Sequence, residues 1–194
     1  MDIILQAWGG GFYLLNKILL ALAEGKEPKR KRQLKIIGWV IYILGVPAWV
    51  VILWYKHAWI AASVEIGGVP SMVLGVFAAY HGNNSSPRIL SVAAAISTYT
   101  FLALGVCYSL YDFGGITSIA QLLEMGVMFG FLIGSYLLAK NNPYGWICFM
   151  LMNGSMATLM FIQQKPLLSL QQLISLGFVI YGFTVAFKSV PPEP

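Results

Sequence analysis

The chain has 194 residues, of which 58% are hydrophobic and only 10% are charged, and its formal net charge is +5. Soluble domains carry about 25% charged residues, so this composition excludes a soluble globular protein and makes lipid the solvent. A single membrane domain is expected over residues 1–190, followed by a short tail at 191–194, with no room for a separate soluble domain.

Seven apolar runs follow one another along the chain, each close to the roughly 20 residues that a helix needs to cross a bilayer. They cover residues 4–23, 36–55, 58–80, 88–110, 115–139, 144–163 and 167–188. Several of the polar breaks between them are very short, so consecutive helices are expected to be antiparallel neighbours. The sequence therefore predicts an all-α integral membrane protein with seven transmembrane helices.

Basic residues gather after the first run, at Lys26, Lys29, Arg30, Lys31, Arg32 and Lys35. Cytoplasmic loops carry such an excess of Lys and Arg, which puts this loop and the C-terminus inside and the N-terminus outside. Arg88, Lys140 and Lys188 then fall on the same inner side. Lys17 is expected to extend its side chain toward that side as well. A basic cluster beside a membrane span indicates topology and contact with anionic lipid, rather than a nucleic-acid site.

The chain repeats itself at a distance of 107 positions. The matched positions are Gly38 and Gly145, Trp39 and Trp146, Pro47 and Gly154, and Pro70 and Gly177. Runs one to three and five to seven therefore form two like units, while the fourth run has no partner. This pattern predicts a 3+1+3 arrangement of two parallel triple-helix bundles, residues 1–82 and 115–190, joined by a linker helix within 83–114.

Helix-weakening residues recur at the same height in both units. Pro47 and Pro70 each remove a backbone donor and kink their helix, and Gly154 and Gly177 allow a bend without that loss. These four positions are predicted hinges, at which one bundle rocks against the other.

Two carboxylates, Glu65 and Glu124, fall inside apolar runs at a similar depth, and Gln172 stands at the position that matches Glu65. A carboxylate at the centre of a membrane helix costs roughly 2.5–3.5 kcal/mol on insertion scales, so such a residue indicates a functional site. Hydration near the interface, or a satisfying neighbour, is the alternative for both Glu residues. The sequence leaves both interpretations open, and with them any coupling to protons.

An aromatic stripe opens the second and the sixth run. Its members are Trp39, Tyr42 and Trp49 in one run, and Trp146, Phe149 and Asn153 in the other. Rings that stack, with an amide that both donates and accepts, suit a flat polar ligand. Trp residues at span ends are also ordinary interface anchors, and we assign Trp39 and Trp59 to that class. Asn153 lies in mid-span, where a binding role is favoured over a hydrogen bond between helices.

Other features favour structural interpretations. Cys107 and Cys148 lie in apolar runs and are expected to be small buried side chains. Gly126, Gly130 and Gly134 have the Gly-x-x-x-Gly spacing of closely packed helices. The sequence contains no nucleotide-binding loop, metal-binding motif or nucleophile–base set. It therefore predicts no enzyme activity, no cofactor and no metal.

Two segments resemble the PnuC family of bacterial vitamin transporters. One runs from Ala139-Lys140-Asn141-Asn142-Pro143-Tyr144-Gly145-Trp146 to Asn153, continues through Phe161 to Leu167, and ends in Tyr181-Gly182 and Lys188. The other runs from Lys56-His57-Ala58-Trp59 through Gly75 to Tyr80. Only Trp146 and, more weakly, Asn153 match motif positions of the family. The second Trp of its Trp-x-x-Trp element is Phe149 here.

The resemblance implies a fold like that of full-length SWEET transporters and a location in the bacterial inner membrane. It implies facilitated diffusion of a vitamin or nucleoside-like solute such as nicotinamide riboside, with a cytoplasmic kinase trapping the substrate by phosphorylation. A sugar transporter of SWEET type and a non-transporting membrane scaffold remain the alternatives. The expected partners are thus a small-molecule substrate and the lipid bilayer, and the sequence leaves open whether the chain forms a homo-oligomer.

Overall fold

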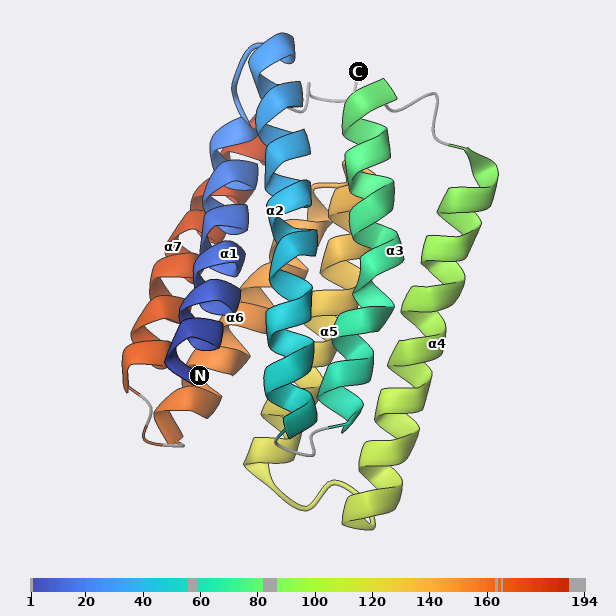
Figure 1. Ribbon diagram of the computed structural model, residues 1–194, viewed down its shortest axis with the longest axis vertical. Helices are drawn as coiled ribbons and strands as arrows, with labels where there is room; N and C mark the ends of the chain where they lie inside the picture. Colours follow the sequence, from blue (N-terminus) through green and yellow to red (C-terminus); the bar gives the residue numbers. More distant parts are fainter. Residues whose placement is uncertain (1, 56–58, 82–86, 163, 165, 189–194) are drawn as a thin grey trace.

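The computed structural model describes residues 2–55, 59–81, 87–162, 164 and 166–188, so the expected tail lies outside the described residues. The helices are α1 (Asp2–Ala23), α2 (Pro28–Tyr55), α3 (Trp59–His81), α4 (Arg88–Phe113), α5 (Ile119–Ala139), α6 (Tyr144–Ile162) and α7 (Pro166–Lys188). They alternate in direction along the chain (Figure 1). The described part of the chain contains no strand, and the prediction of an all-α protein is confirmed.

The helices have the length and composition of membrane spans. In the described part of the chain, six are long and apolar enough to cross a bilayer, and the apolar part of α1, Ala7–Ala23, is shorter. The chain is therefore a multi-pass membrane protein by the length and composition of its helices.

Two helix starts differ from the sequence prediction by about one helical turn or more. Helix α2 begins at Pro28 rather than at 36, because proline suits the first helical position and the following Lys and Arg residues are good helix formers. Helix α5 begins at Ile119 rather than at 115, because Gly114 and Gly115 adopt positive φ angles of 65° and 128°. Ser118 then caps the helix by accepting a hydrogen bond of 3.1 Å from the backbone N–H of Gln121.

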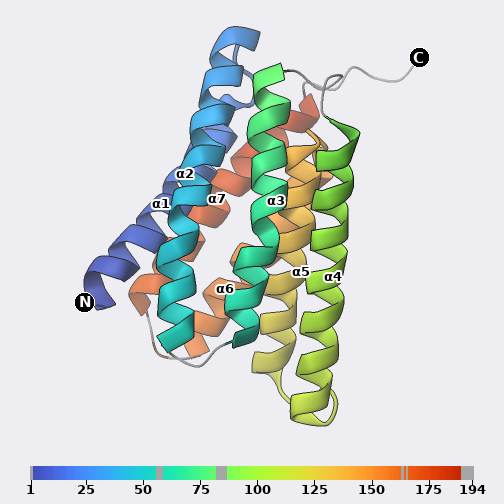
Figure 2. The same cartoon turned by 45° about the vertical axis from the view of Figure 1, so that its right-hand side comes forward.

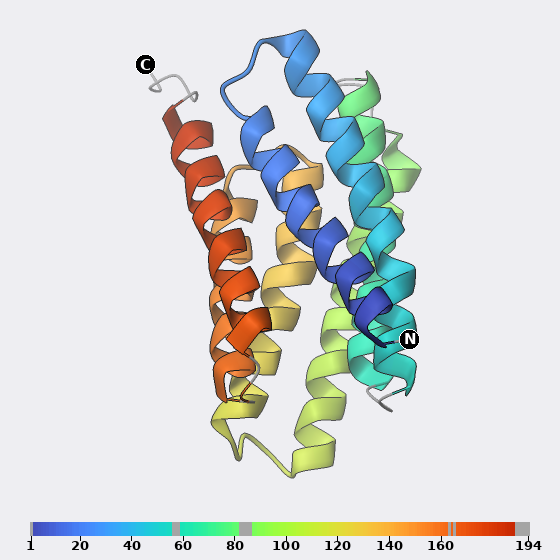
Figure 3. The same ribbon diagram turned by 60° about the vertical axis from the view of Figure 1, so that its left-hand side comes forward.

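Six helices form a closed ring. Going round it, α1 packs against α2, α2 against α3, α3 against α5, α5 against α6, α6 against α7, and α7 against α1. Figure 3 shows the side on which α7, α1 and α2 follow one another. Helix α4 stands outside the ring and packs against α3 and α5 (Figure 2). The contacts α3–α5 and α1–α7 are therefore the two seams between the first three and the last three helices.

The same Trp–Gly contact occurs in both halves of the ring. The indole of Trp39 lies against Gly75, and the indole of Trp146 lies against Gly182. Both indoles are buried, with exposed fractions of 2% and 1%. Each contact joins the second and third helix of its half, and the two contacts stand at matching positions of the expected repeat.

The burial of Trp39 corrects one prediction. Trp39 is not an interface anchor, because the missing side chain of Gly75 leaves a slot that the indole fills. The side chain of Trp59, assigned to the same class, lies outside the described part of the structure.

Close packing of α5 on α6 agrees with the Gly-x-x-x-Gly spacing. A Cβ atom at Gly130 would lie 2.6 Å from the backbone nitrogen of Met152, and one at Gly134 would lie 2.6 Å from the ring of Phe149. The expectation that both cysteines are buried is wrong, because Cys107 is exposed on α4 outside the ring and Cys148 is only partly covered. Both thiols are free.

We predict that Gly182→Ala destabilises the protein by about 1–3 kcal/mol, the usual cost of overpacking a closed core. The added Cβ would lie 2.8 Å from the ring of Trp146, which is fully buried and has no room to move. Thermal unfolding in detergent measures the change. Gly177→Ala on the same helix is the matched control, since its Cβ would meet nothing within 4 Å. Equal melting temperatures for the two variants would contradict the packing described here.

Candidate functional site

The ring surrounds a cavity of about 50 Å³, and each of its six helices contributes to the wall. The polar residues that line it are Tyr13, Lys17, Trp49, Glu65, Asn153, Gln171, Gln172 and Ser175. A space of this size holds a few water molecules. It is well below the roughly 300–1,000 Å³ of sites that enclose a drug-sized ligand. The cavity is therefore central, lined by polar and apolar side chains together, and small in this conformation.

Lys17 is buried at the cavity wall, with an exposed fraction of 1%. Its ammonium nitrogen lies 4.1 Å from the ring centroid of Tyr42 and 3.7 Å from that of Phe149. It also donates a hydrogen bond of 3.2 Å to Oδ1 of Asn16. The expectation that Lys17 extends to the membrane surface is wrong, because the two rings and the amide hold the ammonium inside. Cation–π contacts are worth about 2 kcal/mol or more when they are desolvated.

The two rings that hold Lys17 come from matching positions of the repeat. Tyr42 is on α2 and Phe149 is on α6, 107 positions apart. One ammonium on α1 thus contacts both halves of the ring. These two predicted site residues hold a charged group of the cavity and do not line the cavity themselves.

Glu65 also lines the cavity, from α3. The hydroxyl of Tyr13 donates a hydrogen bond to its Oε2 atom. Gln172, at the matching position in α7, lines the same cavity, so the predicted polar level is present in both halves. Glu124 differs, because its side chain is exposed near the start of α5 and does not line the cavity. The structure thus brings Glu65 and Gln172 together and leaves Glu124 out.

Asn153 is fully buried and lines the cavity. Its Nδ2 group donates a hydrogen bond of 2.7 Å to the carbonyl of Phe149 in the same helix, so the amide does not join two helices. Its Oδ1 atom and the Nε1 atom of Trp49 are buried without a hydrogen-bond partner in the described part of the chain. A buried polar atom without a partner costs about 1–3 kcal/mol, which makes both atoms candidates for contact with a ligand.

The other predicted residues lie away from the cavity. Trp146 is buried against Gly182. Helices α2 and α3 continue through Pro47 and Pro70. A Cβ atom at Gly154 or Gly177 would meet nothing within 4 Å, so neither glycine is required by close packing. Bending at these four positions stays a prediction.

Sequence reasoning missed four polar residues of the wall, which are Tyr13, Lys17, Gln171 and Ser175. Polar residues inside an apolar run were the available signal for all four. The Nε2 group of Gln171 donates a hydrogen bond of 2.7 Å to the carbonyl of Gly10, which joins α7 to α1 at one seam of the ring.

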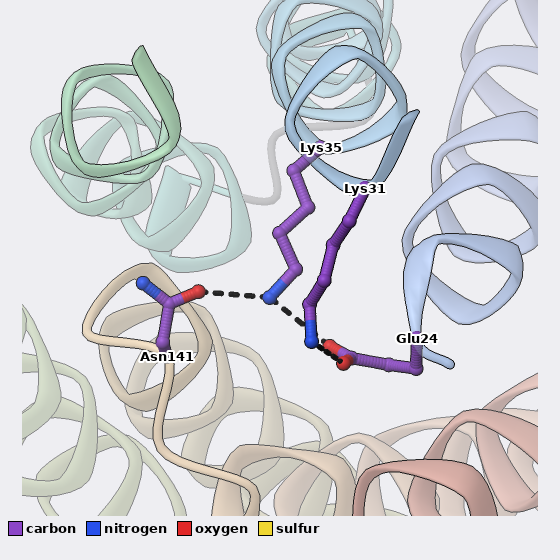
Figure 4. A network of polar contacts seen from close by, with 4 residues as sticks. All are labelled: Glu24, Lys31, Lys35 and Asn141. Atoms are coloured by element: carbon purple, nitrogen blue, oxygen red, sulfur yellow. Dashed lines mark hydrogen bonds and ion pairs between the residues drawn. The ribbon is translucent and has the colours of Figure 1, made fainter. Parts of the chain in front are cut away.

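A second polar network closes the end of the ring where α1 turns into α2 (Figure 4). The carboxylate of Glu24 lies 2.7 Å from the ammonium of Lys31 and 3.0 Å from that of Lys35. Lys35 also donates a hydrogen bond of 2.8 Å to Oδ1 of Asn141, in the turn between α5 and α6. Burial raises the pKa of Glu24, but the attraction of Lys35 and Lys31 outweighs it and leaves the pKa lowered.

Comparison of the chain with family models, with curated proteins and with solved structures finds no match. The geometry of the cavity and the residue pattern of the sequence therefore carry the functional argument.

We predict that Glu24 stabilises the fold at neutral pH and loses this effect in acid. Because its pKa in the folded protein lies below the ordinary 4.5, the contribution is present above that pH and disappears as the pH falls through the lowered pKa. Thermal unfolding of the protein and of Glu24→Gln, measured from neutral pH downward, checks this. The two melting temperatures should differ at neutral pH and converge in acid. A gap that stays constant with pH would contradict the prediction.

Proposed function

We propose that this protein is a facilitative membrane transporter of a small polar solute, which passes through the cavity inside the helix ring. The observation that carries the proposal is the wall of that cavity, which presents an ammonium, a carboxylate and an amide within a bundle of membrane helices. Polar and charged groups inside a membrane protein are costly, and they usually mark solute or ion pathways. A scaffold has no use for them.

The proposed mechanism is alternating access between two triple-helix bundles, α1–α3 and α5–α7, with α4 as the linker helix. The matching Trp–Gly contacts and the two seams, α3–α5 and α1–α7, support this division. A cavity of about 50 Å³ is too small for a vitamin, so this conformation corresponds to a closed state of the cycle. Rocking at Pro47, Pro70, Gly154 and Gly177 would widen one end at a time.

The solute class suggested by the PnuC resemblance is a vitamin or nucleoside-like compound such as nicotinamide riboside. In that case a cytoplasmic kinase traps the solute after entry, and the carrier needs no energy source of its own. A sugar carrier of SWEET type is the second candidate, since aromatic rings beside an amide also suit sugars. The groups of Lys17 and Glu65 in the wall favour a charged solute over a neutral sugar, which gains little from them.

The location that the PnuC resemblance implies is the bacterial cytoplasmic membrane, and the positive-inside pattern predicts that the C-terminus is inside. We predict that a fluorescent protein fused to the C-terminus glows in bacteria, and that alkaline phosphatase fused there is inactive, because the first folds in the cytoplasm and the second needs export. Fusions to the N-terminus should give the reverse result. An active phosphatase at the C-terminus would reverse the assigned orientation.

We predict that liposomes containing the protein equilibrate a vitamin-like solute, and that Asn153→Ala lowers this flux about tenfold. The expected factor follows from the loss of one buried hydrogen bond to the solute, since about 1.4 kcal/mol corresponds to a factor of ten. Radiolabel counterflow measures the flux. Leu151→Ala is the control, because Leu151 is exposed on the same helix. Asn153 has no role in binding if its variant transports as fast as the control.

A further inference from the structure

Lys17 and Glu65 bring opposite charges to one cavity without forming an ion pair with each other. Within the described part of the chain, the pairs closer than 4.0 Å are those of Glu24 with Lys31 and Lys35. Lys17 and Glu65 instead reach the cavity from α1 and α3. The wall thus carries one basic and one acidic group whose charged atoms are more than 4.0 Å apart.

Within the residues that the structure describes, only part of the hydrogen-bonding capacity of these two groups is satisfied. An ammonium has three donors, and Lys17 uses one on Asn16 while the rings of Tyr42 and Phe149 cover it. A carboxylate accepts through two oxygens, and Tyr13 donates to Oε2 of Glu65. Removing such charges from water costs several kcal/mol each unless hydrogen bonds and an opposite charge compensate. The arrangement therefore suits a ligand that supplies both.

We propose that the transported solute is a small zwitterion, with a carboxylate that binds Lys17 and a protonated amine that binds Glu65. This inference rests on the proposed transport function and names the solute by its charges. A solute with one positive charge would be repelled by Lys17, and one with one negative charge would be repelled by Glu65. A solute with one charge of each sign is complementary to a wall that has one ammonium and one carboxylate.

The two orphaned atoms in the wall match the same solute. The Oδ1 atom of Asn153 accepts a further N–H of the amine, and the Nε1 group of Trp49 donates to the carboxylate. A nucleoside offers no carboxylate.

The test begins with the unaltered protein in detergent. Its melting temperature is measured with each of the standard amino acids, with nicotinamide riboside and with thiamine, because a bound ligand stabilises the folded state. Each amino acid that binds is compared with its amide, which lacks the carboxylate, and with its N-acetyl form, which lacks the positive charge. We expect both derivatives to bind at least tenfold more weakly. This comparison needs no variant and is independent of folding.

Variants then assign the two charges. Lys17→Met should remove the preference for an amino acid over its amide, and Glu65→Gln should remove the preference over the N-acetyl form. Lys140→Met, which removes an exposed lysine outside the cavity, should leave both preferences unchanged. Preferences that persist in the first two variants would overturn the inference.

The outcomes separate the two proposals. If nicotinamide riboside or thiamine binds and crosses liposomes while no amino acid does, the zwitterion is wrong and transport stands. If the amides bind as well as the acids, the zwitterion is likewise wrong. If neither the amino acids nor the two vitamins cross in counterflow, both the zwitterion and the proposed function fall.

Discussion

The burial of the Lys17 ammonium between the rings of Tyr42 and Phe149 is the interaction on which the rest of the structure depends. The ammonium is on α1, and the two rings are on α2 and α6, so one charged group holds together helices from both halves. Lipid could not solvate this charge, and the membrane surface is out of its reach in this position. The ammonium of Lys17 needs polar neighbours in this position, and the polar residues of the cavity wall lie beside it.

The ring of six helices that surrounds Lys17 is packed differently within its halves and between them. Each half packs a tryptophan of its second helix into a slot left by a glycine of its third helix, so the second and third helices of each half are closely packed. The seams between the halves rely on other contacts, among them the hydrogen bond from Gln171 to the carbonyl of Gly10. The contacts within each half thus differ from those across the seams, and α4 packs against both halves from outside the ring.

Much of the fold could be predicted from the sequence, because lipid forces every apolar run of sufficient length into a helix. Part of the site was predictable too, since Glu65, Gln172 and Asn153 are polar residues in mid-span. The remainder depends on helix rotation, which a helix that is apolar all round does not reveal. For that reason the sequence left open whether Glu124 lines a site or is hydrated, and its side chain is exposed, while Trp39 and Lys17 were expected near the surface and are buried.

The polar network at the end of the ring takes most of its residues from the first half. Glu24, Lys31 and Lys35 all belong to the first half, and Asn141 is the one member from the second (Figure 4). Separating the halves here would break the contact of Lys35 with Asn141 and leave both ion pairs of Glu24 intact. The ion pair with Glu24 would therefore keep the side chain of Lys35 extended toward Asn141 even when the hydrogen bond between them is broken.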